Sequence, residues 1–156
     1  MASKLKFLGF VILAVAFSAC DRKMVYEDYK SLANLEWPVD SIVTFEFHIE
    51  DTTLNHNMYL NIRNSVDYSY SNLWLFVTIV PPDGKIMKDT MEFPLAGPMG
   101  KWFGNGYGKY RDIQYVYRKN VFFPNSGDYQ FQVKQGMRET NLYGIRDIGF
   151  RVEKVD

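Results

Sequence analysis

Residues 41–50 alternate between polar and apolar side chains, and this alternation constrains the fold more than any other feature of the chain. Val43, Phe45, Phe47 and Ile49 share one parity, while the other parity is mostly polar. Successive side chains of an extended strand point to opposite faces of a sheet. The pattern therefore predicts a strand with one buried face and one solvated face.

Similar segments recur along the chain. We expect further strands at residues 58–62, 73–80, 85–93, 113–121, 128–135 and 144–155. Residues 73–80 are nearly all apolar or β-branched, which predicts a strand covered on both faces. Turn sequences separate several of these segments, as in Pro81-Pro82-Asp83-Gly84. Seven or so short strands without a convincing helix predict an all-β fold, a single antiparallel β-sandwich of jelly-roll or immunoglobulin-like type over residues 41–156.

The N-terminus has the three parts of a secretory signal peptide. A basic start is followed by an apolar run over residues 7–17 and by small residues, Ser18 and Ala19. The apolar run holds about 11 residues, whereas a helix that crosses a membrane needs roughly 20. Residues 1–19 are therefore predicted to be a cleaved signal rather than a permanent anchor.

Cys20 is the only cysteine and directly follows this signal. Phe17-Ser18-Ala19-Cys20 resembles the lipobox of bacterial lipoproteins, in which the cysteine becomes the lipid-bearing first residue. The alternative is a buried free thiol, but a lone cysteine at the end of an export signal has no disulfide partner and favours acylation. We expect residues 20–40 to form a lipidated tether with one turn of helix within residues 26–35.

Charge and length limit the remaining possibilities. Removal of the 19 signal residues from the 156 leaves enough chain for one domain. Two of the 18 Lys and Arg residues leave with the signal, so acidic residues slightly outnumber basic ones in the mature chain. No basic field is present to hold nucleic acid.

Catalytic and metal-binding patterns are weak. The chain has two histidines, His48 and His56, and its one cysteine is predicted to be acylated, which disfavours a nucleophilic triad. His48 alternates with Glu46 and Glu50, so we interpret it as a solvated histidine, with a weak metal or pH-sensitive contact as the alternative. No zinc or calcium spacing is present. We expect a non-enzymatic protein without metal, cofactor or small-molecule substrate.

Aromatic side chains are the best candidates for a binding surface. Residues 97–108 contain five glycines together with Trp102, Phe103 and Tyr107, and residues 64–72 form a polar loop with Tyr68 and Tyr70. Glycines beside bulky aromatics allow sharp turns, or the loop presents its aromatics to a partner. We predict that these five aromatic residues bind a protein partner, although packed tyrosines are commoner and stacking on sugars is an alternative.

Three short patterns suggest a covalent modification. Asp40-Ser41-Ile42, Asp51-Thr52-Thr53 and Asp89-Thr90-Met91 resemble the acceptor sites of the O-glycosylation system of Bacteroidetes. Glycosylation of Ser41, Thr52 or Thr90 is a hypothesis that the intact mass of the mature protein would test.

Several runs in a fixed order resemble the gliding-motility lipoprotein family GldH of Bacteroidetes. They include Tyr68-Ser69-Tyr70-Ser71-Asn72-Leu73, Pro82-Asp83-Gly84, Gly100-Lys101-Trp102, Gly104-Asn105-Gly106-Tyr107-Gly108, Leu142-Tyr143-Gly144-Ile145 and Asp147-Ile148-Gly149-Phe150-Arg151. The resemblance extends from about Val25 to Glu153.

This resemblance implies a cell-envelope lipoprotein needed for gliding, working beside the type IX secretion machinery. It implies a membrane contact through lipid on Cys20 and partners among the gliding and type IX secretion proteins, and it assigns no catalytic residue. We expect attachment to the outer membrane on its periplasmic side. The alternative is a carbohydrate-binding lipoprotein of a glycan-uptake system.

Overall fold

The computed structural model describes residues 21–155. The predicted signal peptide and Cys20 lie outside these residues. The described chain forms strands β1 (Met24–Ser31), β2 (Glu36–Pro38), β3 (Ile42–Ile49), β4 (Asn55–Ser65), β5 (Asn72–Val80), β6 (Met87–Pro94), β7 (Tyr110–Phe122), β8 (Gly127–Gln135), β9 (Asn141–Tyr143) and β10 (Ile145–Lys154). Between residues 21 and 155 no helix is long and apolar enough to cross a membrane.

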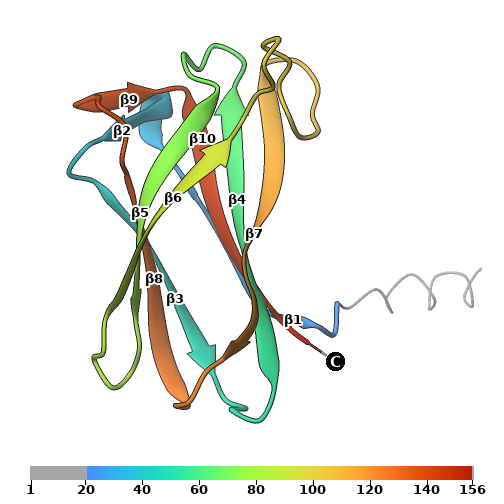
Figure 1. Cartoon of the computed structure of the whole chain (residues 1–156), viewed down its shortest axis with the longest axis vertical. Coiled ribbons are helices and arrows are strands. Elements are labelled where there is room, and N and C mark those ends of the chain that lie inside the picture. Colours follow the sequence, from blue (N-terminus) through green and yellow to red (C-terminus); the bar gives the residue numbers. More distant parts are fainter. Residues whose placement is uncertain (1–20, 156) are drawn as a thin grey trace, which may run out of the picture.

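Two four-stranded sheets pack face to face (Figure 1). The first sheet has the order β1-β10-β4-β7 and the second sheet has the order β3-β8-β5-β6. Every pairing is antiparallel. The predicted antiparallel β-sandwich is thus confirmed. A short pairing of β2 with β9 adds a third, two-stranded sheet.

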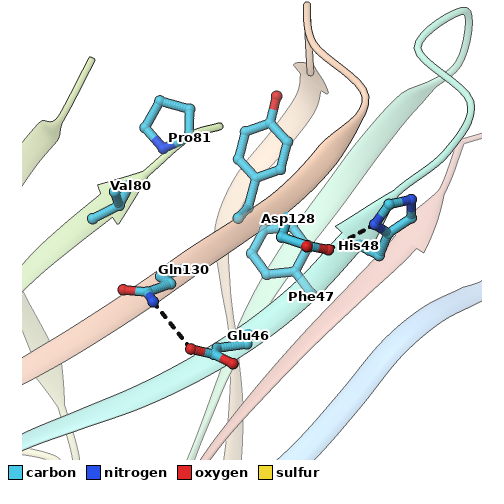
Figure 2. A pocket seen from close by; sticks show the side chains of 8 residues that line it. Glu46, Phe47, His48, Val80, Pro81, Asp128 and Gln130 are labelled. Atoms are coloured by element: carbon cyan, nitrogen blue, oxygen red, sulfur yellow. Dashed lines mark hydrogen bonds and ion pairs between the residues drawn. The ribbon is translucent and has the colours of Figure 1, made fainter. Parts of the chain in front are cut away.

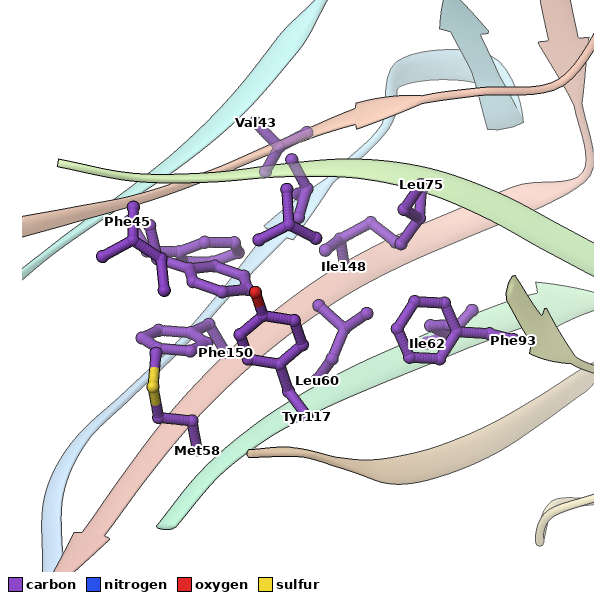
Figure 3. Packing of buried hydrophobic residues seen from close by; sticks show 14 of the residues in the cluster. Val43, Phe45, Met58, Leu60, Ile62, Leu75, Phe93, Tyr117, Ile148 and Phe150 are labelled. Atoms are coloured by element: carbon purple, nitrogen blue, oxygen red, sulfur yellow. The ribbon is translucent and has the colours of Figure 1, made fainter. Parts of the chain in front are cut away.

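The core lies between the inner faces of the two sheets, as the alternation predicted. Phe45 and Phe47 of β3 are almost fully buried, as are the residues of the same parity on β4 and β5. The ring of Phe131 from the second sheet stacks on the ring of Phe150 from the first, with centroids 4.0 Å apart and planes at 7°. Figure 3 shows Phe150 and Phe45 in this core with aliphatic side chains around them. Apolar burial of this kind is the main source of stability in a fold without disulfides.

The tether predicted for residues 20–40 is corrected by the structure. Residues 24–31 form β1, an edge strand that pairs with β10, and Trp37 of β2 is fully buried. A register shift between Met24 and Tyr26 interrupts the alternation of β1, so its sequence lacks a period of two. The helical component is a single 3-10 turn, η1, at Ala33–Leu35.

The prediction that β5 is covered on both faces is wrong. Its side chains alternate between buried and accessible positions, and Trp74 and Phe76 are 39% and 48% exposed. No other layer covers the outer face of the second sheet among the described residues, so the apolar character of β5 exceeds what burial requires.

The strands divide the sandwich into two ends. The Asp21 end carries the start of β1 and the connections 50–54, 81–86 and 123–126. The loop end carries the connections 66–71, 95–109 and 136–140 together with β2 and β9. Strand β4, with 11 residues, runs between the two ends and spans roughly 35 Å. Figure 1 shows the long β6–β7 connection at the top of the sandwich.

Replacement of Phe150 by alanine should remove the ring stack between Phe150 and Phe131. We expect Phe150→Ala to lower the free energy of unfolding by about 3–5 kcal/mol, because the residue is fully buried and its loss leaves a cavity. Phe76→Ala, on the exposed face, is the matched control and should cost less than about 1 kcal/mol. Chemical denaturation measures both values, and equal losses would contradict this account of the core.

Candidate functional site

The glycine-aromatic loop, residues 97–108, folds back on the first strand that follows it. The backbone of Asn105 exchanges two hydrogen bonds with that of Asp112 in β7, at 2.9 and 2.7 Å. Gly104 and Gly106 flank this bridge with φ values of +80° and +143°. A Cβ atom would lie 2.3 Å from the Asp112 carbonyl oxygen at Gly104 and 2.5 Å from the Tyr110 carbonyl oxygen at Gly106. These glycines permit a close approach to β7, in agreement with the turning role predicted for them.

The predicted aromatic contact residues separate into buried and exposed ones. Tyr68 is 4% exposed, and its hydroxyl donates a hydrogen bond to the Asn72 carbonyl oxygen at 2.9 Å. Trp102 is half-buried against the core and lies 6.5 Å from the Tyr68 ring. Phe103 is 42% exposed and Tyr107 is fully exposed. Tyr68 was therefore wrongly predicted as a contact residue, because it is a core residue that supports the loop.

Tyr70 lies at the rim of the loop end. Its ring makes an edge contact with Tyr68, at 5.7 Å between centroids, and its hydroxyl donates a hydrogen bond to the Glu139 carboxylate. That hydrogen bond, together with partial desolvation, raises the pKa of Tyr70. Gln135 donates a hydrogen bond to the Glu139 carbonyl oxygen at 2.8 Å. Tyr70 thus joins the 66–71 loop to the 136–140 loop.

An ion network holds the base of the loop end. The Arg63 guanidinium binds the Asp112 carboxylate and, at 3.0 Å, the buried carboxylate of Asp147. Asp147 also accepts a hydrogen bond from Ser31 at 2.6 Å. The guanidinium of Arg146 lies 4.4 Å from the centroid of the Tyr110 ring, a cation–π distance. The network ties β1, β4, β7 and β10 together below the glycine-aromatic loop.

His48 lies on the outer face of the second sheet, as predicted. Its Nδ1 is 2.7 Å from the Asp128 carboxylate, and both side chains are mostly exposed. Figure 2 shows this pair beside Glu46 and Gln130 in a hollow of about 540 Å³. Across residues 21–155, no three His, Cys, Asp or Glu side chains are grouped as metal ligands.

His56 is a buried histidine for which the sequence predicted no role. It is 2% exposed, packs against Phe123 at 5.3 Å, and its Nδ1 has no hydrogen-bond partner among the described residues. Burial and nearby Lys154 lower its pKa below the usual 6.5. His56 shares the parity of Met58, Leu60 and Ile62, and this alternation is the signal that places it on the inner face.

The three predicted glycosylation residues lie in different settings. Ser41 is partly buried and its carbonyl oxygen accepts a hydrogen bond from Trp37 at 3.1 Å. Thr52 lies in the β3–β4 turn, and Thr90 is exposed on β6. Modification of these residues stays a prediction.

Comparison with known proteins gives a consistent family match. A family model described as GldH lipoprotein matches residues 24–152. A gliding motility lipoprotein GldH homologue from Christiangramia forsetii is 40% identical, with 100% of this chain and 99% of the relative covered. Gliding motility lipoprotein GldH from Flavobacterium johnsoniae is 35% identical, with 98% and 99% covered.

Solved structures give only a distant match. A family GH115 4-O-methyl-α-glucuronidase aligns at a TM-score of 0.44 with 13% identity, over 88% of this chain and 18% of the enzyme. A likeness at this level indicates nothing about activity.

His56 should make the stability depend on pH. Because its pKa in the folded protein lies below that of the unfolded chain, stability is fully present above about pH 6.5 and falls as the pH drops below that value. We expect His56→Leu to stay within about 1 kcal/mol of the parent at pH 7 and to lose less stability between pH 7 and 5.5. His48→Gln, at the exposed histidine, is the control. It should lose as much stability as the parent protein between pH 7 and 5.5. Chemical denaturation at both pH values measures these stabilities. An identical loss of stability in all three proteins would contradict the role of His56.

Proposed function

Because this chain belongs to the GldH lipoprotein family, we propose that it is a non-enzymatic interaction module of gliding motility and associated type IX secretion. In this proposal lipid on Cys20 anchors it to the outer membrane, facing the periplasm. Its loop end binds other envelope proteins of the same machinery.

The observation that carries this proposal is the exposure of Phe103 and Tyr107 at the loop end. Exposed aromatic side chains on an ordered loop are typical of protein-binding surfaces, since aromatic residues supply most of the energy at many interfaces. The backbone bridge between Asn105 and Asp112 orders the loop before binding. An ordered loop loses little conformational entropy when a partner binds.

The distance between the two ends supports the same proposal. Asp21, next to the predicted lipid, lies at one end of the sandwich, and the glycine-aromatic loop lies at the other. Strands of about 35 Å therefore separate the loop from the anchored residue. Such a spacing presents the loop beyond the headgroup region of the membrane.

Replacing both exposed aromatics should abolish partner capture without unfolding the protein. We expect Phe103→Ala with Tyr107→Ala, in the native host, to reduce crosslinking to gliding and type IX secretion components by about tenfold, with stability within about 0.5 kcal/mol of the parent. Affinity purification with mass spectrometry and colony spreading on agar provide the readouts. Phe76→Ala, an exposed aromatic on the sheet face, is the control. Unchanged capture and spreading in the double variant would refute the loop as the contact surface.

A second candidate function, carbohydrate binding, is favoured by a hollow on the outer face of the second sheet. It has a volume of about 380 Å³ and is lined by Tyr70, Trp74, Asn72 and Arg138, among others. Aromatic faces beside amide and guanidinium groups suit stacking and hydrogen bonding to a sugar.

Carbohydrate binding depends on Trp74, whereas protein binding depends on the loop. If the second candidate is correct, a glycan array should detect binding at about millimolar affinity or tighter, and Trp74→Ala should weaken it about tenfold or more. The Phe103→Ala, Tyr107→Ala protein is the control here and should bind glycans like the parent. Absence of any glycan signal would remove this candidate.

A further inference from the structure

Asp21, the first described residue, is fixed to the sandwich by Arg151 of β10. The Arg151 side chain is 13% exposed and is surrounded by three carboxylates. Its Nε and Nη1 bind Glu153 at 2.6 Å and Glu27 at 2.9 Å, and its Nη2 binds Asp21. The hydrogen bond from Arg151 holds the pKa of Asp21 below its usual range. Asp21 is therefore part of the folded domain rather than of a spacer.

Asp21 directly follows Cys20, the predicted lipid-bearing residue, in the sequence. Adjacent Cα atoms are about 3.8 Å apart, so lipid on Cys20 would begin within one residue of the Arg151 cluster. A domain anchored so closely cannot move far from the bilayer. The surface around Asp21 must therefore be compatible with lipid.

The strand register shows which surface this is. Across the first sheet, Met24 pairs with Glu153, Lys154 with His56, and Asn55 with Phe122. Successive pairings are offset by one residue, and together they cross the four strands at the Asp21 end. Neighbouring strands lie about 4.8 Å apart, so Phe122 is roughly 15 Å from Met24 across the sheet.

An apolar groove opens at this end between β6 and β7, the edge strands of the two sheets. It has a volume of about 570 Å³ and reaches the core residues Met58 and Phe123. Ile86, Met87 and Phe122 line it, and they are 56%, 48% and 59% exposed. Large apolar side chains gathered at one exposed place mark an interaction surface.

Charged side chains at the groove are neutralised by neighbours. Lys85 lies 3.6 Å from the Asp83 carboxylate, and Arg118 lies 2.8 Å from that of Asp89. The charged side chains at the groove are thus paired with opposite charges, and the rest of its contact surface is largely apolar. A zwitterionic lipid surface suits it, because insertion of apolar side chains requires no anionic headgroup.

We propose that the Asp21 end of the sandwich docks on the bilayer, with Ile86, Met87 and Phe122 inserted into the interfacial region beside the lipid of Cys20. This proposal rests on the lipid attachment in the proposed function. The lipid holds the domain at the surface, and each inserted apolar side chain favours one orientation over free rotation. The docked domain directs its glycine-aromatic loop away from the membrane.

Site-specific labelling of the mature lipoprotein tests the docking. Acylation would occupy the only native thiol, so Ile86→Cys, Phe122→Cys and Tyr107→Cys each provide a single site for a fluorophore. The labelled lipoproteins are reconstituted into phosphatidylcholine vesicles whose acyl chains carry bromine, a quencher. We expect quenching at positions 86 and 122 to exceed that at position 107 by at least about threefold. The same ratio is expected after anionic lipid is added.

A charged substitution tests the docking, and a measurement of intact mass tests the lipid anchor. Ile86→Asp should reduce quenching of a label at position 122 by about half or more, because a carboxylate resists insertion. Equal quenching at positions 107 and 122 in acylated protein would overturn the docking and leave the anchor intact. A blue-shifted but unquenched label at position 122 would indicate that the groove holds the protein's own acyl chain. This result would also overturn the docking. A mass without lipid would refute the anchor itself.

Discussion

The stack of Phe131 on Phe150 is the contact on which the sandwich depends. β8 and β10 are inner strands of the second and first sheets, and the stack joins the two layers at their centre. Phe45 and Phe47 of β3 extend this centre with rings 5.8 and 5.3 Å from that of Phe150. Because the described residues contain no cysteine to form a disulfide, this apolar contact must hold the two sheets together.

The packing at this centre determines where the two ends of the sandwich lie. The sheets meet along the aromatic cluster, and the connections between strands extend from it in opposite directions. One end holds Asp21 through the Arg151 cluster, and the other holds the glycine-aromatic loop through the Asn105–Asp112 bridge. In the proposed function, the fold separates an anchoring surface from a surface for partners, and one set of strands supports both.

Much of the fold was predictable because burial imposes a period of two on inner strands. The alternation of β3 identified its inward residues correctly, and β4, β8 and β10 were located within a few residues of their bounds. β1 was missed because an edge strand with a register shift has no such period. For β5, composition was misleading, since Trp74 and Phe76 lie on the outer face although they are apolar.

The candidate site was less predictable than the fold. The sequence identified a loop rich in glycine and aromatic residues, but exposure depends on contacts between distant segments. Tyr68 is buried because the chain around Gly144 approaches it closely, and a Cβ at Gly144 would lie 2.9 Å from the Tyr68 Cα. Local sequence could not distinguish it from Tyr107, which is fully exposed.

The place of β10 also determines when this protein can fold. The last strand of the chain lies between β1 and β4, and Arg151 binds Asp21 across 130 residues of sequence. Pairing between such distant segments forms slowly, because the chain loses the entropy of loop closure before the stabilising contacts form. A chain that emerges from a translocation channel with its N-terminus first cannot complete the first sheet until its final residues have passed through. Lipid attachment at its start and folding of its body would therefore be separate events in time.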